Sequence, residues 1–67
     1  MSIEEIENKI LEILKNKNII SKRDLFSYFE NKDDVKKALE NLISKGIIFE
    51  INVLGGNYYG LKNNKNR

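Results

Sequence analysis

The stretch GIIFEINVLGGNYYGLK, residues 46–62, has the pattern of a β-hairpin. Its first half alternates between an apolar face and a mixed face. The apolar face carries Ile47, Phe49 and Ile51, and the mixed face carries Ile48, Glu50 and Asn52. The central LGGN supplies residues that tolerate the positive φ of a tight turn, and the return strand places Tyr58 away from the face shared by Tyr59 and Leu61. Because an isolated hairpin is marginally stable in water, it must pack against the rest of the chain.

Two helices are predicted in the first half of the chain. The first spans about Ile3–Lys17, because Ser2 and Glu5 have the spacing of a capping box and Ile and Leu then recur at helical spacing. A short extended piece follows it. The second helix spans about Lys22–Glu30 and is capped by Ser21. Its apolar face consists of Leu25, Phe26 and Phe29.

A third helix is predicted from Asn31 or Lys32 to Gly46. Its core-facing residues recur at i, i+3, i+4, i+7 and i+8, and they are Val35, Ala38, Leu39, Leu42 and Ile43. Asp33 and Asp34 complement the positive end of the helix dipole, and Gly46 ends the helix in a left-handed conformation. The chain is therefore an α+β protein with three helices followed by a two-stranded antiparallel hairpin.

The 67 residues allow one domain, which we place at 1–61, followed by a basic tail at 62–67 that we expect to be disordered. The tail holds three of the 12 Lys and Arg residues, which leaves nine against 10 Asp and Glu in residues 1–61. Cysteine and histidine are absent, which argues against disulfides, metal sites and most catalysis, so we expect no cofactor and no enzyme. No apolar run reaches the ~18 residues of a membrane span, so we expect a cytoplasmic protein without membrane contact.

The stretch ISKRDLFSYFENKDDVKKALENLISKGIIFEI, residues 20–51, resembles the winged helix-turn-helix family of small archaeal-type regulators. The residues that carry the resemblance lie in the third helix and at its junction with the following strand, and they are Val35, Ala38, Leu39, Leu42, Lys45, Gly46 and Ile48. GIIFE followed by GNYYGL is also similar, more weakly, to the carboxy-terminal winged helix of archaeal replicative helicases. The resemblance implies a helix-turn-helix with the hairpin as a wing beside it.

The resemblance implies that duplex DNA is the partner and that the protein regulates transcription, associated with the nucleoid. In the family the third helix enters the major groove, and the second helix and the wing contact phosphates. The candidate DNA-binding residues are Lys22, Arg23, Lys32, Lys36, Lys37, Asn41, Asn57, Tyr58 and Lys62. Asp33 and Asp34 depart from the family pattern, since carboxylates at the start of the third helix repel phosphates. For the exposed face of that helix, a solvated surface with i, i+4 ion pairs is the alternative interpretation.

Two kinds of protein contact are also open. A homodimer would give two half-sites, with a seam on the first helix formed by Ile3, Ile10, Leu11 and Leu14. The alternative function is a protein-interaction winged helix that serves as an accessory of replication or transcription machinery. The uncharged wing tip, the acidic start of the third helix and the balanced charge of residues 1–61 favour this alternative.

Overall fold

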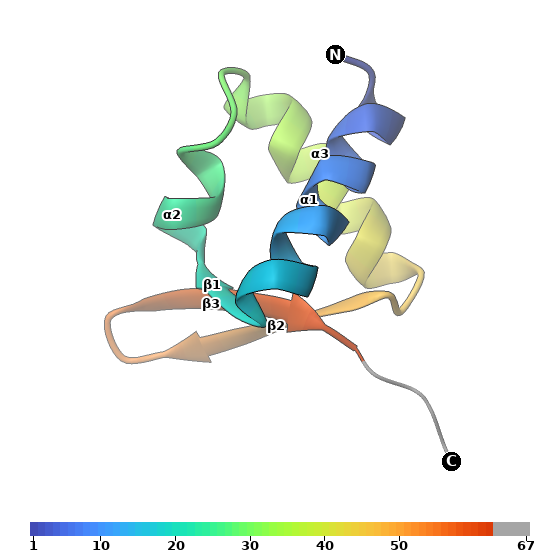
Figure 1. Ribbon diagram of the computed structural model, residues 1–67. Helices are drawn as coiled ribbons and strands as arrows, with labels where there is room; N and C mark the ends of the chain where they lie inside the picture. The colour runs from blue at the N-terminus through green and yellow to red at the C-terminus, as the bar shows by residue number, and fades with distance from the viewer. Residues whose placement is uncertain (63–67) are drawn as a thin grey trace.

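The computed structural model describes residues 1–62 of the 67-residue chain. Its elements are α1 (Ile3–Lys17), β1 (Ile19–Ser21), α2 (Lys22–Phe26), α3 (Lys32–Ser44), β2 (Ile48–Val53) and β3 (Gly56–Leu61). Three helices and an antiparallel sheet form a small α+β fold, with α1 and α3 packed side by side on one face of the sheet (Figure 1). Apart from Lys62, the predicted basic tail lies outside the described residues.

The sheet has three strands in the order β1-β3-β2, where the sequence predicted two. β2 and β3 form the predicted hairpin, paired from Ile48↔Leu61 to Val53↔Gly56. The short extended piece after α1 pairs with the other edge of β3, from Ile19↔Gly60 to Ser21↔Tyr58. β1 therefore ties the start of α2 to the start of β3.

The helix ends follow the predicted capping chemistry. The Ser2 hydroxyl accepts from the Glu5 amide at 3.1 Å, and the Glu5 carboxylate accepts from the Ser2 amide at 2.9 Å. Gly46 has a φ of 73° and donates its amide to the carbonyl of Ile43, while the Ile47 amide reaches the carbonyl of Leu42, both at 3.0 Å. This pair of bonds is a Schellman motif, which satisfies the last carbonyls of α3 and turns the chain into the hairpin.

α2 is shorter than predicted and ends at Phe26 rather than near Glu30. After Phe26 the backbone bonds tighten to i→i+3 spacing, from Tyr28 to Leu25 at 3.2 Å and from Phe29 to Phe26 at 3.1 Å. The Ser27 hydroxyl donates to the carbonyl of Asp24 at 2.6 Å, which competes with continuation of the helix. The predicted apolar face still packs inward, because Leu25 and Phe26 are buried and Phe29 is half-buried.

The core lies between the helices and the sheet. Its buried side chains are Ile6, Ile10, Leu14, Ile20, Leu25, Phe26, Val35, Ala38, Leu39, Leu42, Ile48 and Tyr59. Each large aliphatic side chain buried here contributes roughly 1.5–3 kcal/mol, far more than an exposed ion pair. The predicted dimer seam on α1 is wrong for Ile10 and Leu14, which are 0% exposed inside their own chain. Ile3 and Leu11 are partly buried against the same core.

The sheet turns its mixed face toward the helices. Ile48, Tyr59 and Ile20 point into the core, and Glu50 lies beside Tyr59 on the same face. Ile19, Phe49, Ile51, Val53 and Tyr58 therefore share the opposite face. Within residues 1–62, α1 and α3 lie on the other side of the sheet (Figure 1), and α2 borders this face where Tyr58 lines a hollow together with Lys22 and Phe26.

Candidate functional site

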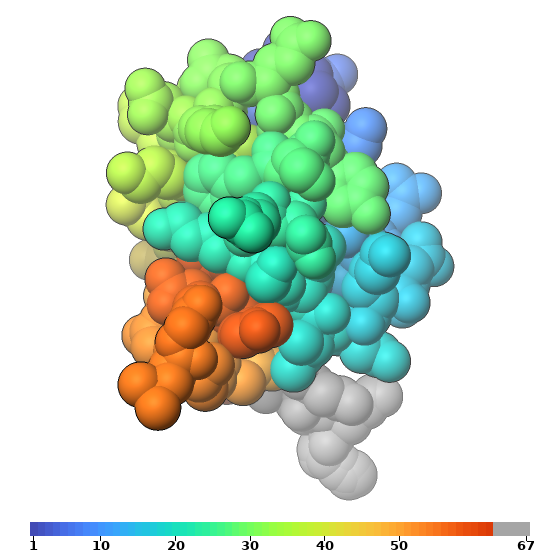
Figure 2. Space-filling view, turned by 90° about the vertical axis from the view of Figure 1, so that its left-hand side faces the viewer, coloured from blue at the N-terminus to red at the C-terminus, as the bar shows by residue number. Residues whose placement is uncertain are grey.

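A hollow separates the start of α2 from the loop of the β2–β3 hairpin. Its volume is about 660 Å³, and it is lined by Ser21, Lys22, Arg23, Phe26, Gly55, Gly56, Asn57 and Tyr58. The antiparallel pair Ser21↔Tyr58 explains how residues far apart in the sequence meet here. Figure 2 shows this face, with the start of α2 near its centre and the hairpin below it. Among residues 1–62, no carboxylate lines the hollow, so its charge is positive.

A second, smaller hollow of about 160 Å³ adjoins the first and shares Lys22 and Phe26 with it. The remaining lining comes from α3 and the sheet, and it consists of Lys36, Leu39, Glu40, Ile43, Glu50 and Tyr59. The Lys22 Nζ atom lies 5.8 Å from the centre of the Phe26 ring, within the range of a cation–π contact. Lys36 therefore lies on the same face of the molecule as Lys22.

Tyr59 and Glu50 form a polar pair at the floor of the second hollow. The Tyr59 hydroxyl donates to the Glu50 carboxylate at 3.3 Å. Burial, followed by the negative charge of Glu50 and this hydrogen bond, raises the pKa of Tyr59 to about 12. Tyr59 therefore stays neutral at physiological pH and serves as a hydrogen-bond donor to Glu50.

The neighbouring lysines Lys36 and Lys37 lie on different sides of α3. Lys32, Lys36 and Glu40 follow one another at i, i+4 spacing along the side that borders the second hollow. Lys37 is four residues before Asn41, on the side nearer α1. The Asn41 side-chain nitrogen donates to the Glu7 carboxylate of α1 at 3.0 Å, and Lys45 approaches the same carboxylate at 3.6 Å.

The Glu7 contact changes the interpretation of Asn41. The sequence placed Asn41 among the candidate DNA-binding residues. In the structure the amide nitrogen already has a partner on α1. Asn41 therefore holds α1 and α3 together and lies apart from the hollow that Lys22 and Lys36 share.

The two acidic residues at the start of α3 differ in exposure, since Asp33 is exposed and Asp34 is half-buried. The Asn31 side chain caps α3 by accepting from the Asp34 amide at 3.1 Å, and both Asp33 and Asp34 occupy the first turn. Asp34 is half-buried and lines a different hollow together with Met1, Ile6 and Phe29. The carboxylate of Asp34 therefore lies away from the basic hollow, which reduces the repulsion that the sequence suggested for a bound phosphate.

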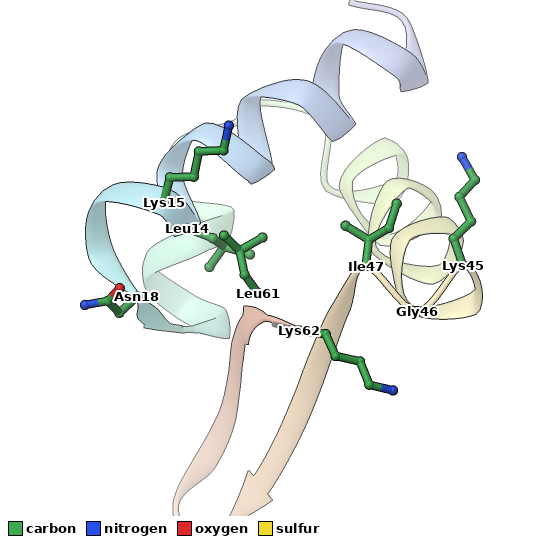
Figure 3. A pocket seen from close by; sticks show the side chains of 8 residues that line it. All are labelled: Leu14, Lys15, Asn18, Lys45, Gly46, Ile47, Leu61 and Lys62. Atoms are coloured by element: carbon green, nitrogen blue, oxygen red, sulfur yellow. The ribbon is translucent and has the colours of Figure 1, made fainter. Parts of the chain in front are cut away.

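Lys62 lies at the opposite end of β3 from Asn57 and Tyr58. It borders a third hollow of about 670 Å³, lined by Leu14, Lys15, Asn18, Lys45, Gly46, Ile47, Leu61 and Lys62. Lys15 and Lys45 lie on opposite sides of this hollow, and Lys62 points the other way (Figure 3). The Lys62 amide donates to the carbonyl of Ile47 at 2.9 Å, which closes the sheet at this end. The three lysine side chains of the third hollow therefore do not converge on one point (Figure 3).

The structure therefore groups five of the nine candidate residues: Lys22, Arg23, Lys36, Asn57 and Tyr58. Lys32 and Lys37 are exposed on α3, while Asn41 and Lys62 lie elsewhere. Sequence reasoning missed Ser21 and Phe26 as lining residues, because only the pairing of β1 with β3 brings them beside the hairpin.

Residues 1–62 contain no group of three or more acidic, Cys or His side chains placed to hold a metal ion. Among the same residues no helix is long and apolar enough to cross a bilayer.

Comparisons with protein-family models, with curated proteins and with solved structures found no match to this chain.

Proposed function

We propose that this chain is a small winged-helix protein that binds duplex DNA and regulates transcription. In this proposal α2 and α3 are the helix-turn-helix and the β2–β3 hairpin is the wing. One observation carries it: Lys22 and Arg23 lie across a hollow from Asn57 and Tyr58, and no carboxylate in residues 1–62 lines that hollow. Cationic and polar side chains from a helix and a hairpin on one face suit a phosphate backbone.

The three contributing elements have different roles in this proposal. Lys22 and Arg23 contact phosphates, and Asn57 and Tyr58 contact the backbone of the same duplex from the hairpin. Lys36 reaches the groove from α3 and can donate to guanine O6 and N7. The 13 residues of α3 span roughly 20 Å at 1.5 Å per residue, and a helix fits the ~12 Å width of the major groove.

A salt titration of duplex binding by fluorescence anisotropy tests the proposal. Lys36→Ala is compared with Lys37→Ala, which removes the same charge from the adjacent residue on the α1 side of α3. We expect Lys36→Ala to weaken binding and to reduce the slope of log K against log salt by about 1, because binding then releases about one fewer counterion from the duplex. Lys37→Ala should leave both quantities closer to those of the unmodified protein.

A chain shortened to residues 1–61 completes the experiment, because residues 62–67 carry three cations. If duplex binding disappears only in the shortened chain, while Lys36→Ala and Lys22→Ala/Arg23→Ala bind normally, the proposed face is not the binding surface. Absence of binding at low salt contradicts the proposal altogether.

The second hollow favours a protein partner as a second candidate function. Its two lysines, Lys22 and Lys36, are balanced by two carboxylates, Glu40 and Glu50, and Ile43 is 37% exposed beside them. An accessory role in replication or transcription machinery suits such a mixed surface. This function is favoured over the first if the unmodified protein does not bind duplex DNA but specifically captures one such protein, and if Ile43→Lys abolishes that capture.

A further inference from the structure

The outer edge of β2 is open. In the sheet order β1-β3-β2, β2 pairs with β3 on one side and, within residues 1–62, with no strand on the other. Natural edge strands are protected by short length, Pro, bulges or charged side chains, including inward-pointing ones. Of these features β2 has one, the carboxylate of Glu50, which accepts a hydrogen bond from the Tyr59 hydroxyl. β2 has six residues with the sequence IFEINV, pairs with β3 residue for residue, and contains neither Lys nor Pro.

The other edge of the sheet differs from this one. β1 is three residues long, which by itself limits pairing with another strand. The asymmetry between the two edges points to β2 as the place where the sheet can continue.

An apolar surface runs along β2 on the face of the sheet away from the helices. Ile51 is 37% exposed and Val53 is 50% exposed there, and Leu54 at the hairpin tip is fully exposed. Phe49 shares the face and lies over Gly60. The open edge and the apolar face therefore belong to the same strand.

We propose that two copies of this chain associate through β2, which pairs antiparallel with β2 of the second copy about a two-fold axis at Ile51. The charges and the apolar residues of the strand select this register. It places Ile51 opposite Ile51 of the second copy, and Phe49 opposite Val53. Glu50, the one charged residue of β2, then faces the uncharged amide of Asn52.

The neighbouring registers are less favourable. A two-fold axis at Glu50 places two carboxylates directly opposite each other, which is destabilising. A shift by one residue places Glu50 opposite Ile51, so that the helices of the two copies lie on opposite faces of the sheet. With the axis at Ile51, both copies keep their helices on one face and join their apolar faces on the other.

Disulfide trapping tests the register, because the chain contains no cysteine and single-cysteine variants are unambiguous. In the proposed register the two Ile51 Cα atoms lie about 4.5–5.5 Å apart, within the range of about 4.4–6.8 Å that a disulfide bridges. We expect Ile51→Cys to form a cross-linked dimer rapidly under mild oxidation.

Val53→Cys is the matched control, on the same strand and the same face. Its two copies are offset by four residues along the strand, which separates them by more than about 13 Å. We expect it to cross-link at least about tenfold more slowly than Ile51→Cys. Equal rates for the two variants, or faster cross-linking of Val53→Cys, would overturn the proposed register.

Sedimentation velocity of the unmodified protein across a concentration series tests the association itself. We expect a reversible monomer–dimer equilibrium that Ile51→Lys shifts to monomer and that Ile19→Lys, on the same face but on β1, leaves in place. A protein that stays monomeric throughout overturns the proposal and leaves the edge to a strand of another protein. Equal disruption by both variants overturns edge pairing in favour of face-to-face packing. Neither measurement uses DNA, so its outcome is independent of the proposed DNA binding.

Discussion

Gly60 is a glycine of β3 that has no room for a side chain. A Cβ atom added at this position would lie 2.6 Å from Phe49 Cζ, 3.0 Å from Phe49 Cε2 and 3.1 Å from the carbonyl oxygen of Asn18. Gly60 is also the point where β1 and β2 flank β3, at Ile19 and Phe49. The missing side chain therefore allows the Phe49 ring to lie over the middle of the three-stranded sheet.

We expect Gly60→Ala to lower the free energy of unfolding by about 1–3 kcal/mol, because the Phe49 ring and the α1–β1 connection must both move. Gly56→Ala is the matched control: it lies on the same strand, and no atom of residues 1–62 lies within 4 Å of its added Cβ. Urea unfolding followed by circular dichroism measures both. Equal stability of the two variants would contradict the close packing of Phe49 on Gly60.

Tyr59 gives the fold a defined response to alkaline pH. Its pKa is raised from 10.0 to about 12 by burial first and then by Glu50, so the folded state favours the neutral phenol. This contribution is fully present below pH 10, where the unfolded chain also keeps the proton. It declines as the pH rises from about 10 to about 12, because only the unfolded chain gains by ionising in that range.

The difference in tyrosinate absorbance between the unmodified protein and Tyr59→Phe isolates this titration. We expect its midpoint near pH 12, and we expect Glu50→Gln to lower the midpoint because it removes the negative charge beside the phenol. A midpoint near the ordinary value of 10 would show that Tyr59 is neither buried nor bonded as described.

At the scale of elements, the sequence predicted the features that neighbouring residues determine, such as the ends of α1 and α3. The capping box at Ser2 and the left-handed Gly46 mark helix ends within a few residues, so both were readable from the sequence. β1 could not be predicted as a strand, since its three residues form one only by pairing with residues some forty positions later. The end of α2 depends on the hydrogen bond from the Ser27 hydroxyl to the Asp24 carbonyl, which competes with the helix. The spacing of apolar residues gives no sign of this bond.

In the candidate site too, the sequence predicted local features but not those that depend on contacts between distant residues. The sequence identified the basic side chains, because charge is visible without a structure. It treated Lys36, Lys37 and Asn41 as one exposed face, although the direction of Asn41 depends on Glu7 of α1. Which exposed residues share a hollow is decided by packing between distant elements, and the sequence carries no local signal for it.

The contact between α1 and α3 is testable through Asn41. We expect Asn41→Ala to lower the free energy of unfolding by about 0.5–1.5 kcal/mol, because the Glu7 carboxylate loses a hydrogen-bond donor. Lys37→Ala, one turn earlier on the same side of α3, is the control and should change stability by less than about 0.5 kcal/mol. Duplex affinity should be unaffected by Asn41→Ala. A loss of affinity without a loss of stability would instead place Asn41 in a DNA contact.

At the scale of the whole molecule, the charges are balanced overall and separated in space. The formal net charge is +2, and three of the cations lie in residues 62–67. On the described part of the chain the hollow between α2 and the hairpin is positive, and it adjoins the apolar face of the sheet at Tyr58, which lines the hollow and pairs with Ile51. The two proposed surfaces, one for phosphate and one for a second copy, are therefore neighbours that meet at Tyr58.

The most direct measurement of the central proposal is an amide NMR titration of the unmodified, isotope-labelled protein with a short mixed-sequence duplex at low salt. We expect the largest chemical-shift changes at Lys22, Arg23, Lys36, Asn57 and Tyr58, and we expect these changes to weaken as salt is added. Shifts confined to residues 62–67, or the absence of shifts at low salt, would contradict the proposal.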